Sequence, residues 1–268
     1  MPMQSEPAKA PVKKGIVVMI DALGARTFST EASQRFLEAR DRVLADCEAT
    51  RALLRSMATS DTELVTFGDT IILCWPLRET ATDEVFLPAL AEWLRKVMLS
   101  GFHHGMLFRG AIAVGEYIQT GATVLGPAVA DAAVWYDRAD WMGIIATPNC
   151  GLRLSFLKER IEASTERLDD ATPLLGSWYV EYPVPFKDGT QRILWALSWP
   201  AQYLFDSHNP KGPKKAGRKK LPVFNGSELF RFHISRFPVP AGTEGKFSNT
   251  TSFFEWFRKS VKLGPPDD

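Results

Sequence analysis

The sequence predicts an α+β protein, one mixed sheet with flanking helices, from two observations. Apolar runs of strand length alternate with longer segments of helical periodicity through about residue 200, without strict strand–helix–strand repetition. The 268 residues contain no evident internal repeat and are enough for one large domain with an extension. We therefore expect a disordered arm over 1–14, the sheet domain over 15–200 and a C-terminal extension over 201–268.

Strands are expected where short apolar or β-rich runs stop at turn residues. The expected strands are 15–21, 64–67, 70–75, 106–114, 116–119, 143–147, 178–183 and 192–199. The second and third meet in a tight turn at Gly68 and Asp69, and the last two flank a turn that carries Lys187. Arg109 interrupts a strand whose other residues are apolar or small. Taken alone, Arg109 also fits a strand-edge arginine paired to a carboxylate, and Lys187 a solvated turn lysine.

Helices are expected where apolar residues recur at spacings of three and four. The expected helices are 29–57, 82–99, 125–136, 149–163 and 252–261. The third begins at Gly126 and Pro127, a typical helix entry. Its small residues would allow tight packing, including packing against another subunit.

The extension contains two contrasting segments. A basic segment rich in Pro and Gly spans 209–220, where a solvated linker is favoured over contact with phosphate or nucleic acid. The aromatic residues that follow indicate a packing element rather than disorder: Phe230, Phe232, Phe237, Phe253, Phe254, Trp256 and Phe257.

The composition narrows the compartment and the partners. The net charge of +1 gives no general argument for nucleic acid or an anionic membrane as a partner. Cys47, Cys74 and Cys150 lack CxxC spacing, which fits a reducing cytoplasm and argues against a disulfide framework or structural zinc. No apolar segment precedes Ile16, and none is long enough to cross a bilayer. We expect a cytoplasmic protein without a signal peptide.

Two aspartates point to metal chemistry. Asp21 ends the first apolar strand and opens into a turn of small residues, and Asp69 lies in the tight turn between two strands. A lone Asp after a strand is usually an N-cap or turn residue. Two carboxylates on neighbouring strand ends could instead hold a pair of divalent cations for phosphoryl chemistry.

The order of these features resembles the catalytic domain of class III nucleotidyl cyclases, over about 16–199. The family has a metal-binding Asp with a small turn, a second metal Asp in a hairpin, an arginine-bearing strand followed by Gly, a Gly-x-x-Val helix start and a late hairpin lysine. The matching residues are Asp21, Ala22, Leu23, Gly24, Gly68, Asp69, Arg109, Ala111, Ile112, Gly115, Gly126, Val129 and Lys187.

The resemblance implies a ferredoxin-like, palm-type sheet that cyclises a nucleoside triphosphate and releases pyrophosphate. It implies that Asp21, Asp69 and the backbone carbonyl of Ala22 hold two divalent ions, Mn²⁺ or Mg²⁺. The residues it assigns to the phosphates are Leu23, Gly24, Arg109 and Lys187.

The sequence departs from the purine cyclases at the residues that read the base. Val65 stands where they have a Lys, and Thr123 where adenylate cyclases have an Asp, so the base pocket lacks both polar readers of a purine edge. The family's Asn and Arg on the interface helix align with Ala130 and Val134. Their roles at the ribose and in the transition state would then pass to Arg26, Arg138 or another arginine.

This combination resembles the Pycsar pyrimidine cyclases of bacterial antiphage defence. That resemblance implies a homodimer with composite active sites that makes cUMP or cCMP on infection, with UTP favoured over CTP as the substrate. The product would activate a separate effector. Three alternatives stay open: a catalytically inactive cyclase-like domain that binds nucleotide or dimerises, a palm-type nucleotidyltransferase, and a binding protein that uses the aromatic tail.

Overall fold

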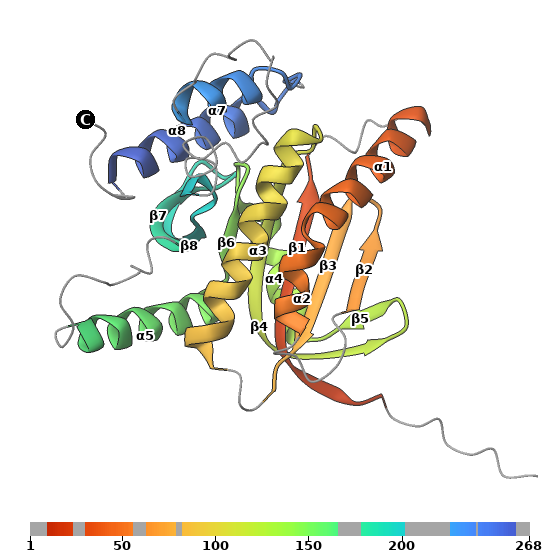
Figure 1. Ribbon diagram of the computed structural model, residues 1–268, viewed down its shortest axis with the longest axis vertical. Coiled ribbons are helices and arrows are strands. Elements are labelled where there is room, and N and C mark those ends of the chain that lie inside the picture. The colour runs from red at the N-terminus through yellow and green to blue at the C-terminus, as the bar shows by residue number, and fades with distance from the viewer. Residues whose placement is uncertain are drawn as a thin grey trace, which may run out of the picture.

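The structure, a computed structural model, describes residues 10–23, 30–55, 63–78, 82–165, 178–201, 226–239 and 241–260. These residues form one mixed sheet with helices on both faces (Figure 1), so the predicted α+β class is confirmed. The basic segment 209–220 lies outside the described residues.

The sheet has the strand order β2-β3-β1-β4-β6-β8-β7, and β5 pairs with the outer part of β4. Every pairing is antiparallel except that of β4 with β6. The strands are β1 (Val12–Ala22), β2 (Glu63–Phe67), β3 (Thr70–Pro76), β4 (Phe108–Thr120), β5 (Thr123–Leu125), β6 (Ile144–Ala146), β7 (Tyr179–Pro185) and β8 (Gln191–Leu197). The continuous apolar run of β1 is explained by its place between β3 and β4, where both of its faces are covered.

The helices divide between the two faces of the sheet. They are α1 (Thr30–Asp46), α2 (Glu48–Arg55), α3 (Asp83–His103), α4 (Pro127–Arg138), α5 (Pro148–Thr165), α7 (Gly226–Ile234) and α8 (Glu244–Ser260). Figure 1 shows α1, α2 and α3 in front of the central strands and α4 behind them, with α7 and α8 together near β6–β8. Among the described helices, none combines the length and the hydropathy needed to cross a membrane.

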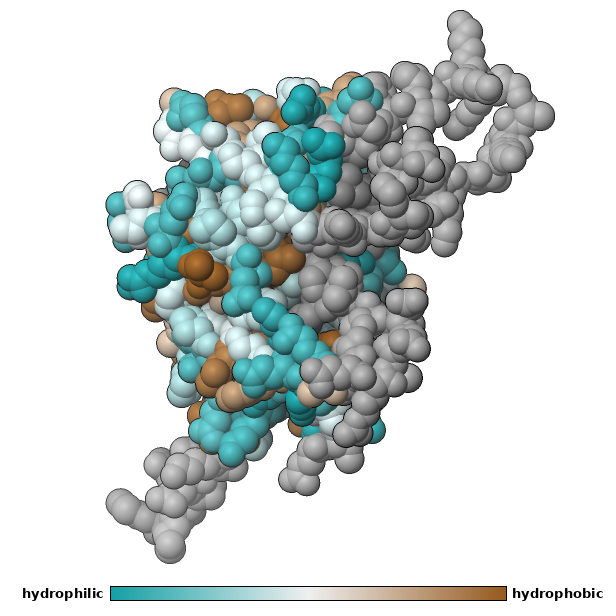
Figure 2. Space-filling view, turned by 90° about the vertical axis from the view of Figure 1, so that its left-hand side faces the viewer, coloured by the Kyte–Doolittle hydropathy of each residue, from teal (hydrophilic) through white to brown (hydrophobic). Residues whose placement is uncertain are grey.

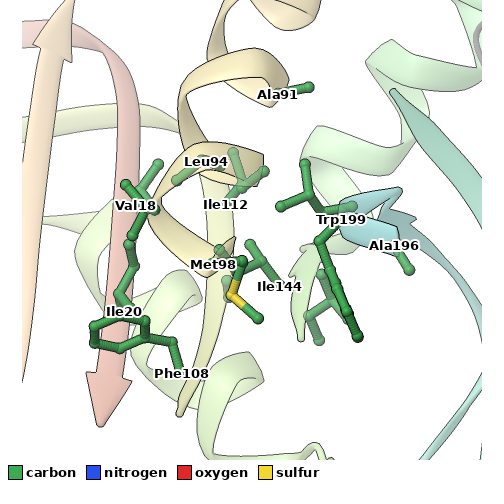
Figure 3. Close-up of a cluster of buried hydrophobic side chains, with 14 of the residues drawn as sticks. Val18, Ile20, Ala91, Leu94, Met98, Phe108, Ile112, Ile144, Ala196 and Trp199 are labelled. Atoms are coloured by element: carbon green, nitrogen blue, oxygen red, sulfur yellow. The ribbon is translucent and has the colours of Figure 1, made fainter. Parts of the chain in front are cut away.

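The larger core lies between α3 and the sheet (Figure 3). Leu94 and Met98 of α3 lie over Val18 of β1 and Ile112 of β4, and all four side chains are almost fully buried. Burying one such side chain stabilises the fold by ~1.5–3 kcal/mol, so this layer holds α3 firmly against β1 and β4.

A smaller apolar cluster lies on the opposite face, beneath α4. Its members are Val17, Met19, Cys74, Ala113, Tyr117, Val124, Ala128 and Ala132. Side chains alternate between the two faces along a strand, so Asp21 shares this face with Val17 and Met19. The helix lies close to the sheet because Gly126 has no side chain; a Cβ there would lie 2.8 Å from the Cα of Tyr117.

The extension packs on the sheet domain. Phe230 of α7 stacks on Phe254 of α8 with 4.2 Å between ring centroids, and Phe253 lies 4.7 Å from the ring of Tyr182 on β7. Phe253, Phe254 and Phe257 of α8 are fully buried, as expected of a packing element, whereas Phe232 of α7 is 48% exposed.

Several elements differ from the prediction. The helix expected over 252–261 is α8, which begins at Glu244, and α7 is not among the expected helices. The helix expected over 29–57 is two helices, with a break at Cys47. The strand expected over 116–119 is the outer part of β4, which continues through Gly115; the chain reverses at Gly121 (φ 56), and the returning strand is β5. The first strand begins at Val12, inside the predicted arm, because Val12 pairs with Ile118.

The side of the molecule formed by α5, β7 and β8 carries scattered apolar residues (Figure 2). Exposed examples from these elements are Leu152, Phe156 and Ile193. A cavity of about 310 Å³ lies between α5, β6 and β8, lined by residues that include Thr147, Ser155 and Trp195. None of its lining residues is one of the predicted site residues.

Candidate active site at the end of the central strand

The structure places Asp21 and Asp69 together. Asp21 is the second-last residue of β1, and Asp69 lies in the β2–β3 turn, where Gly68 takes a φ of 59°. The backbone N–H of Ala22 donates to the carbonyl oxygen of Asp69 at 3.2 Å, so the turn is fixed against the strand end. The predicted juxtaposition of the two aspartates on neighbouring strand ends is thus what the fold contains.

Arg109 forms a buried ion pair with Asp21. The two residues are directly opposite each other in the β1–β4 ladder. The Nε and Nη2 atoms of Arg109 both donate to Oδ2 of Asp21, at 3.0 and 2.9 Å, and the two residues are only 5% and 8% exposed. The other carboxylate oxygen, Oδ1, accepts from the Thr70 hydroxyl at 3.3 Å.

The pKa of Asp21 is nevertheless raised. Burial raises it most, Arg109 lowers it through the hydrogen bond and its charge, and the charge of Asp69 raises it. A second carboxylate close enough to act in this way disfavours the ionised form, and a cation between the two would favour it. The electrostatics of the Asp21–Asp69 pair therefore suit a bound cation.

The donor set also suits Mg²⁺ or Mn²⁺. No group of three or more His, Cys, Asp or Glu side chains gathers as a metal site in the part of the chain that the structure describes. A metal held by Asp21 and Asp69 would complete its coordination with backbone carbonyl, water and phosphate oxygens. Mg²⁺ is commonly bound in this way, by one or two carboxylates together with the phosphates of the substrate.

Asp137 is a site residue that the sequence reasoning missed. It lies in the last turn of α4 and accepts from Lys187 Nζ at 2.6 Å and from Arg109 Nη2 at 3.2 Å, both through Oδ1. Lys187 and Arg109 lower the pKa of Asp137, with the Lys187 hydrogen bond the largest cause. An acidic residue in the last turn of a helix opposes the helix dipole, and this is the sequence signal that could have drawn attention to it.

The β7–β8 turn brings Lys187 to this cluster. The Lys187 backbone N–H donates to the carbonyl oxygen of Arg138 at 3.0 Å, which fixes the turn against the end of α4. On the other side of the cluster, Arg109 lies over the ring of Tyr136, 5.4 Å from its centroid. Arg109 and Lys187, far apart in the sequence, thus share the Asp137 carboxylate.

Of the other residues predicted for the phosphates and the transition state, the structure describes Leu23 and Arg138. The Leu23 backbone N–H donates to the carbonyl oxygen of Leu107 at 2.8 Å, directly after Asp21 and Ala22. Arg138 lies at the cluster by its backbone, while its guanidinium lies over the Trp135 ring at 5.6 Å. Gly24 and Arg26 lie outside the described residues.

The two residues of the predicted base pocket lie at opposite ends of the sheet. Val65 is in register with Ile72 of β3, which pairs with Met19 of β1, so it lies near Asp21. Thr123 lies on β5, which pairs with β4 from Ile118 onward. Ile118 is nine positions along β4 from Arg109, the partner of Asp21, which is roughly 30 Å at the usual rise per residue.

Comparison with known proteins finds similar solved structures but no family. No protein-family model matches the sequence, and a search of curated proteins finds no match. Among solved structures, it is similar to the catalytic core of a rhodopsin-guanylyl cyclase with converted specificity in complex with ATPαS, at 10% identity, over 71% of this chain and 98% of that one, with a TM-score of 0.45. It is also similar to an adenylate/guanylate cyclase/hydrolase from Silicibacter pomeroyi (14% identity, 70% and 98% covered, TM-score 0.40).

A third similar structure is the adenylyl cyclase CyaB from P. aeruginosa, at 11% identity, over 70% of this chain and 95% of that one, with a TM-score of 0.40.

Proposed function

We propose that this protein is a nucleotide cyclase that converts a pyrimidine nucleoside triphosphate to its 3′,5′-cyclic monophosphate and pyrophosphate. One observation carries the proposal. Two carboxylates suited to a divalent cation, Asp21 and Asp69, lie beside two cations suited to phosphate, Arg109 and Lys187. These four residues come from β1, the β2–β3 turn, β4 and the β7–β8 turn, so only the fold brings them together.

In the reaction, the 3′-oxygen attacks the α-phosphorus, and the bond from that phosphorus to the oxygen bridging to the β-phosphate breaks. The 3′-hydroxyl proton passes to water, and pyrophosphate leaves. Asp21, Asp69 and the Ala22 carbonyl would hold two divalent ions, which when bound polarise the α-phosphate and acidify the 3′-hydroxyl. Arg109 and Lys187 offset the charge that develops on the leaving pyrophosphate.

In the site without nucleotide, Asp137 supplies the negative charge that phosphate oxygens would supply in the complex. Its carboxylate pairs with both Arg109 and Lys187. A bound triphosphate would compete with this carboxylate for the two cations. Because the Asp137 side chain is about half exposed, it can turn toward solvent when phosphate oxygens replace it.

The proposal assigns the base preference to Val65 and Thr123. Neither can present the charged group with which purine cyclases read a purine edge. UTP is favoured over CTP. Because Thr123 and Asp21 lie at opposite ends of one protomer, a site that uses both needs a second copy of the chain.

The surface around α4 supports such a homodimer. Val134 is 51% exposed on α4, and Leu125 on the adjoining β5 is 64% exposed. Exposed apolar side chains near the small-residue helix would be covered in a symmetric pair. The cyclic nucleotide made by the dimer would act as a second messenger for a separate effector in antiphage defence.

The test is incubation of the purified protein with ATP, GTP, CTP or UTP, each with Mn²⁺, followed by mass spectrometry of the products. We expect a cyclic monophosphate from UTP, or from CTP, and from no purine nucleotide. A product from ATP or GTP would contradict the pyrimidine assignment. No product from any of the four would contradict the cyclase assignment.

A second candidate is a catalytically inactive cyclase-like domain that binds nucleotide. It is favoured by Ala130 and Val134, which stand where the family has polar residues and are both exposed on α4. This candidate predicts that calorimetry detects metal-dependent binding of a triphosphate while the cyclisation assay detects no turnover.

A further inference from the structure

The first part of α8 docks beside the candidate active site. Asn249 Nδ2 donates to the carbonyl oxygen of Asp140 at 2.8 Å, and the Thr250 hydroxyl accepts from the backbone N–H of Met142 at 2.8 Å. Both contacts are to the loop that joins α4 to β6 (139–143). Gly245 passes close to this loop, since a Cβ there would lie 3.1 Å from Oδ2 of Asp140. This loop follows directly on the end of α4, so α8 is positioned by the segment that carries the site.

The same loop is fixed to the β7–β8 turn. The Asp140 backbone N–H donates to the carbonyl oxygen of Pro185 at 2.9 Å, and Ala139 forms a β-bridge with Phe186. The end of α4, the turn that carries Lys187 and the start of α8 are therefore one hydrogen-bonded unit. A side chain on the first turns of α8 has a fixed relation to the site.

Lys246 is the cation on this part of α8, and its side chain is partly buried. Burial lowers the pKa of Lys246; the charges of Arg109 and Lys187 lower it further, while those of Asp140 and Asp21 raise it. The Lys246 ammonium thus lies within electrostatic range of both predicted phosphate-binding cations.

Three cations, on β4, the β7–β8 turn and the first turn of α8, therefore lie on elements that meet at the end of α4. Like charges at short range repel, and the repulsion is strongest where water is partly excluded. Asp137 offsets this repulsion for Arg109 and Lys187, with which it forms ion pairs. A polyanion bound among the three cations would offset it for all of them.

We propose that Lys246 is a third phosphate-binding residue of the cyclase site and binds the outer phosphates of the nucleoside triphosphate together with Lys187. This inference rests on the proposed function and extends it: the C-terminal extension becomes part of the active site. A lysine ammonium suits this role because it is a compact charge with three donors for phosphate oxygens.

The test compares Lys246→Gln and Lys246→Arg with the wild type, and Lys259→Gln serves as a control on the exposed last turn of α8. Calorimetry with Mg²⁺ measures binding of inorganic pyrophosphate and, separately, of UMP, which lacks the outer phosphates. We expect Lys246→Gln to bind pyrophosphate about tenfold more weakly with UMP binding unchanged, since one charge-assisted hydrogen bond is lost. Lys246→Arg should restore most of the affinity, and Lys259→Gln should match the wild type.

Parallel cyclisation assays and melting curves separate the outcomes. If the wild type cyclises a nucleotide and Lys246→Gln binds pyrophosphate as the wild type does, the role of Lys246 is wrong and the proposed function stands. Equal weakening of pyrophosphate and UMP binding with a lower melting temperature would show a structural role instead. A wild type that neither binds pyrophosphate nor cyclises any nucleotide would overturn both proposals.

Discussion

At the scale of single residues, the site is a chain of alternating charges. Asp21, Arg109, Asp137 and Lys187 are linked in that order by ion pairs, and the first pair is buried. Removing one partner of a buried ion pair typically costs ~3–5 kcal/mol because the other charge is left without compensation. The Asp21–Arg109 pair therefore has a structural role as well as the proposed catalytic one.

Asp137→Asn should lower the KM for the triphosphate about fivefold and leave kcat within about twofold of the wild type. The carboxylate competes with phosphate for Lys187 and Arg109, and removing a partly exposed competitor of this kind is worth ~1 kcal/mol. Steady-state kinetics over a range of UTP concentrations measure both constants. A higher KM in the variant would show that Asp137 positions the two cations for the substrate and does not compete with it.

The site residues that the sequence predicts are those that local motifs mark. Asp21 follows an apolar strand, Asp69 lies in a turn, and Lys187 occupies a hairpin. Lys246 has no such local mark, and Asp137 has only its unfavourable place in the last turn of a helix, because the relation of both to the site depends on how α4 and α8 pack. No sequence pattern could state that Arg109 pairs with Asp21 in particular, since that depends on the β1–β4 register.

At the scale of elements, a carboxylate at the end of α1 bonds to the last turn of α3. Asp46, the last residue of α1, accepts from the Ser100 hydroxyl at 2.6 Å and lies 2.9 Å from Nε2 of His104. The hydrogen bond from Ser100 is the largest cause of a lowered pKa for Asp46. This contact fixes the end of α1 against the last turn of α3.

Asp46→Ala should reduce the free energy of unfolding by ~1 kcal/mol at pH 7, because the Ser100 hydroxyl loses its acceptor and solvent screens the rest. The pKa of Asp46 is lower in the folded state than its ordinary 3.8, so its contribution is present above that pH and is lost as the pH falls through the lowered folded value.

Urea denaturation at pH 7 and at pH 3 measures this difference, with Asp41→Ala as a control at an exposed position of α1. The gap between wild type and Asp46→Ala should narrow at the lower pH. A gap that widens on acidification would contradict the assignment.

The elements are predicted best where burial makes the pattern strong. The central strand is recognisable because apolar residues fill both of its faces. The helix break at Cys47 is not recognisable, because the helical pattern of the sequence continues across it. The continuation of β4 through Gly115 is not recognisable either, because a glycine suggests that a strand ends there. Tertiary contacts decide both.

At the scale of the whole molecule, one protomer lacks part of the proposed pocket. Asp21 lies at the end of β1, beside the start of β4, and Thr123 lies on β5, beside the far end of β4. The distance between Thr123 and Asp21 follows from the strand register, which cannot be read from the sequence. If the proposed pocket uses both residues, it needs the second copy of the chain that the resemblance implies.

Val134→Asp should convert the proposed dimer to a monomer and reduce cyclisation at least a hundredfold, because a desolvated carboxylate without a partner disfavours the interface. Analytical ultracentrifugation measures the mass, and circular dichroism checks the fold. Val85→Asp, at an exposed valine on α3, is the matched control and should remain dimeric and active. A Val134→Asp protein that stays dimeric would place the interface elsewhere.

The central claim is that the Asp21–Asp69 pair holds the metal ions of a nucleotide cyclase, and Asp69→Asn tests it most directly. Asparagine keeps the turn and its backbone hydrogen bond to Ala22 but removes the negative charge that a cation needs. The measurement is the rate of cyclic UMP formation from UTP with Mn²⁺, by mass spectrometry, for wild type and variant with matching melting curves. The predicted result is turnover by the wild type and a loss of at least about a hundredfold in the variant. Full activity of a folded Asp69→Asn protein would contradict the two-metal assignment.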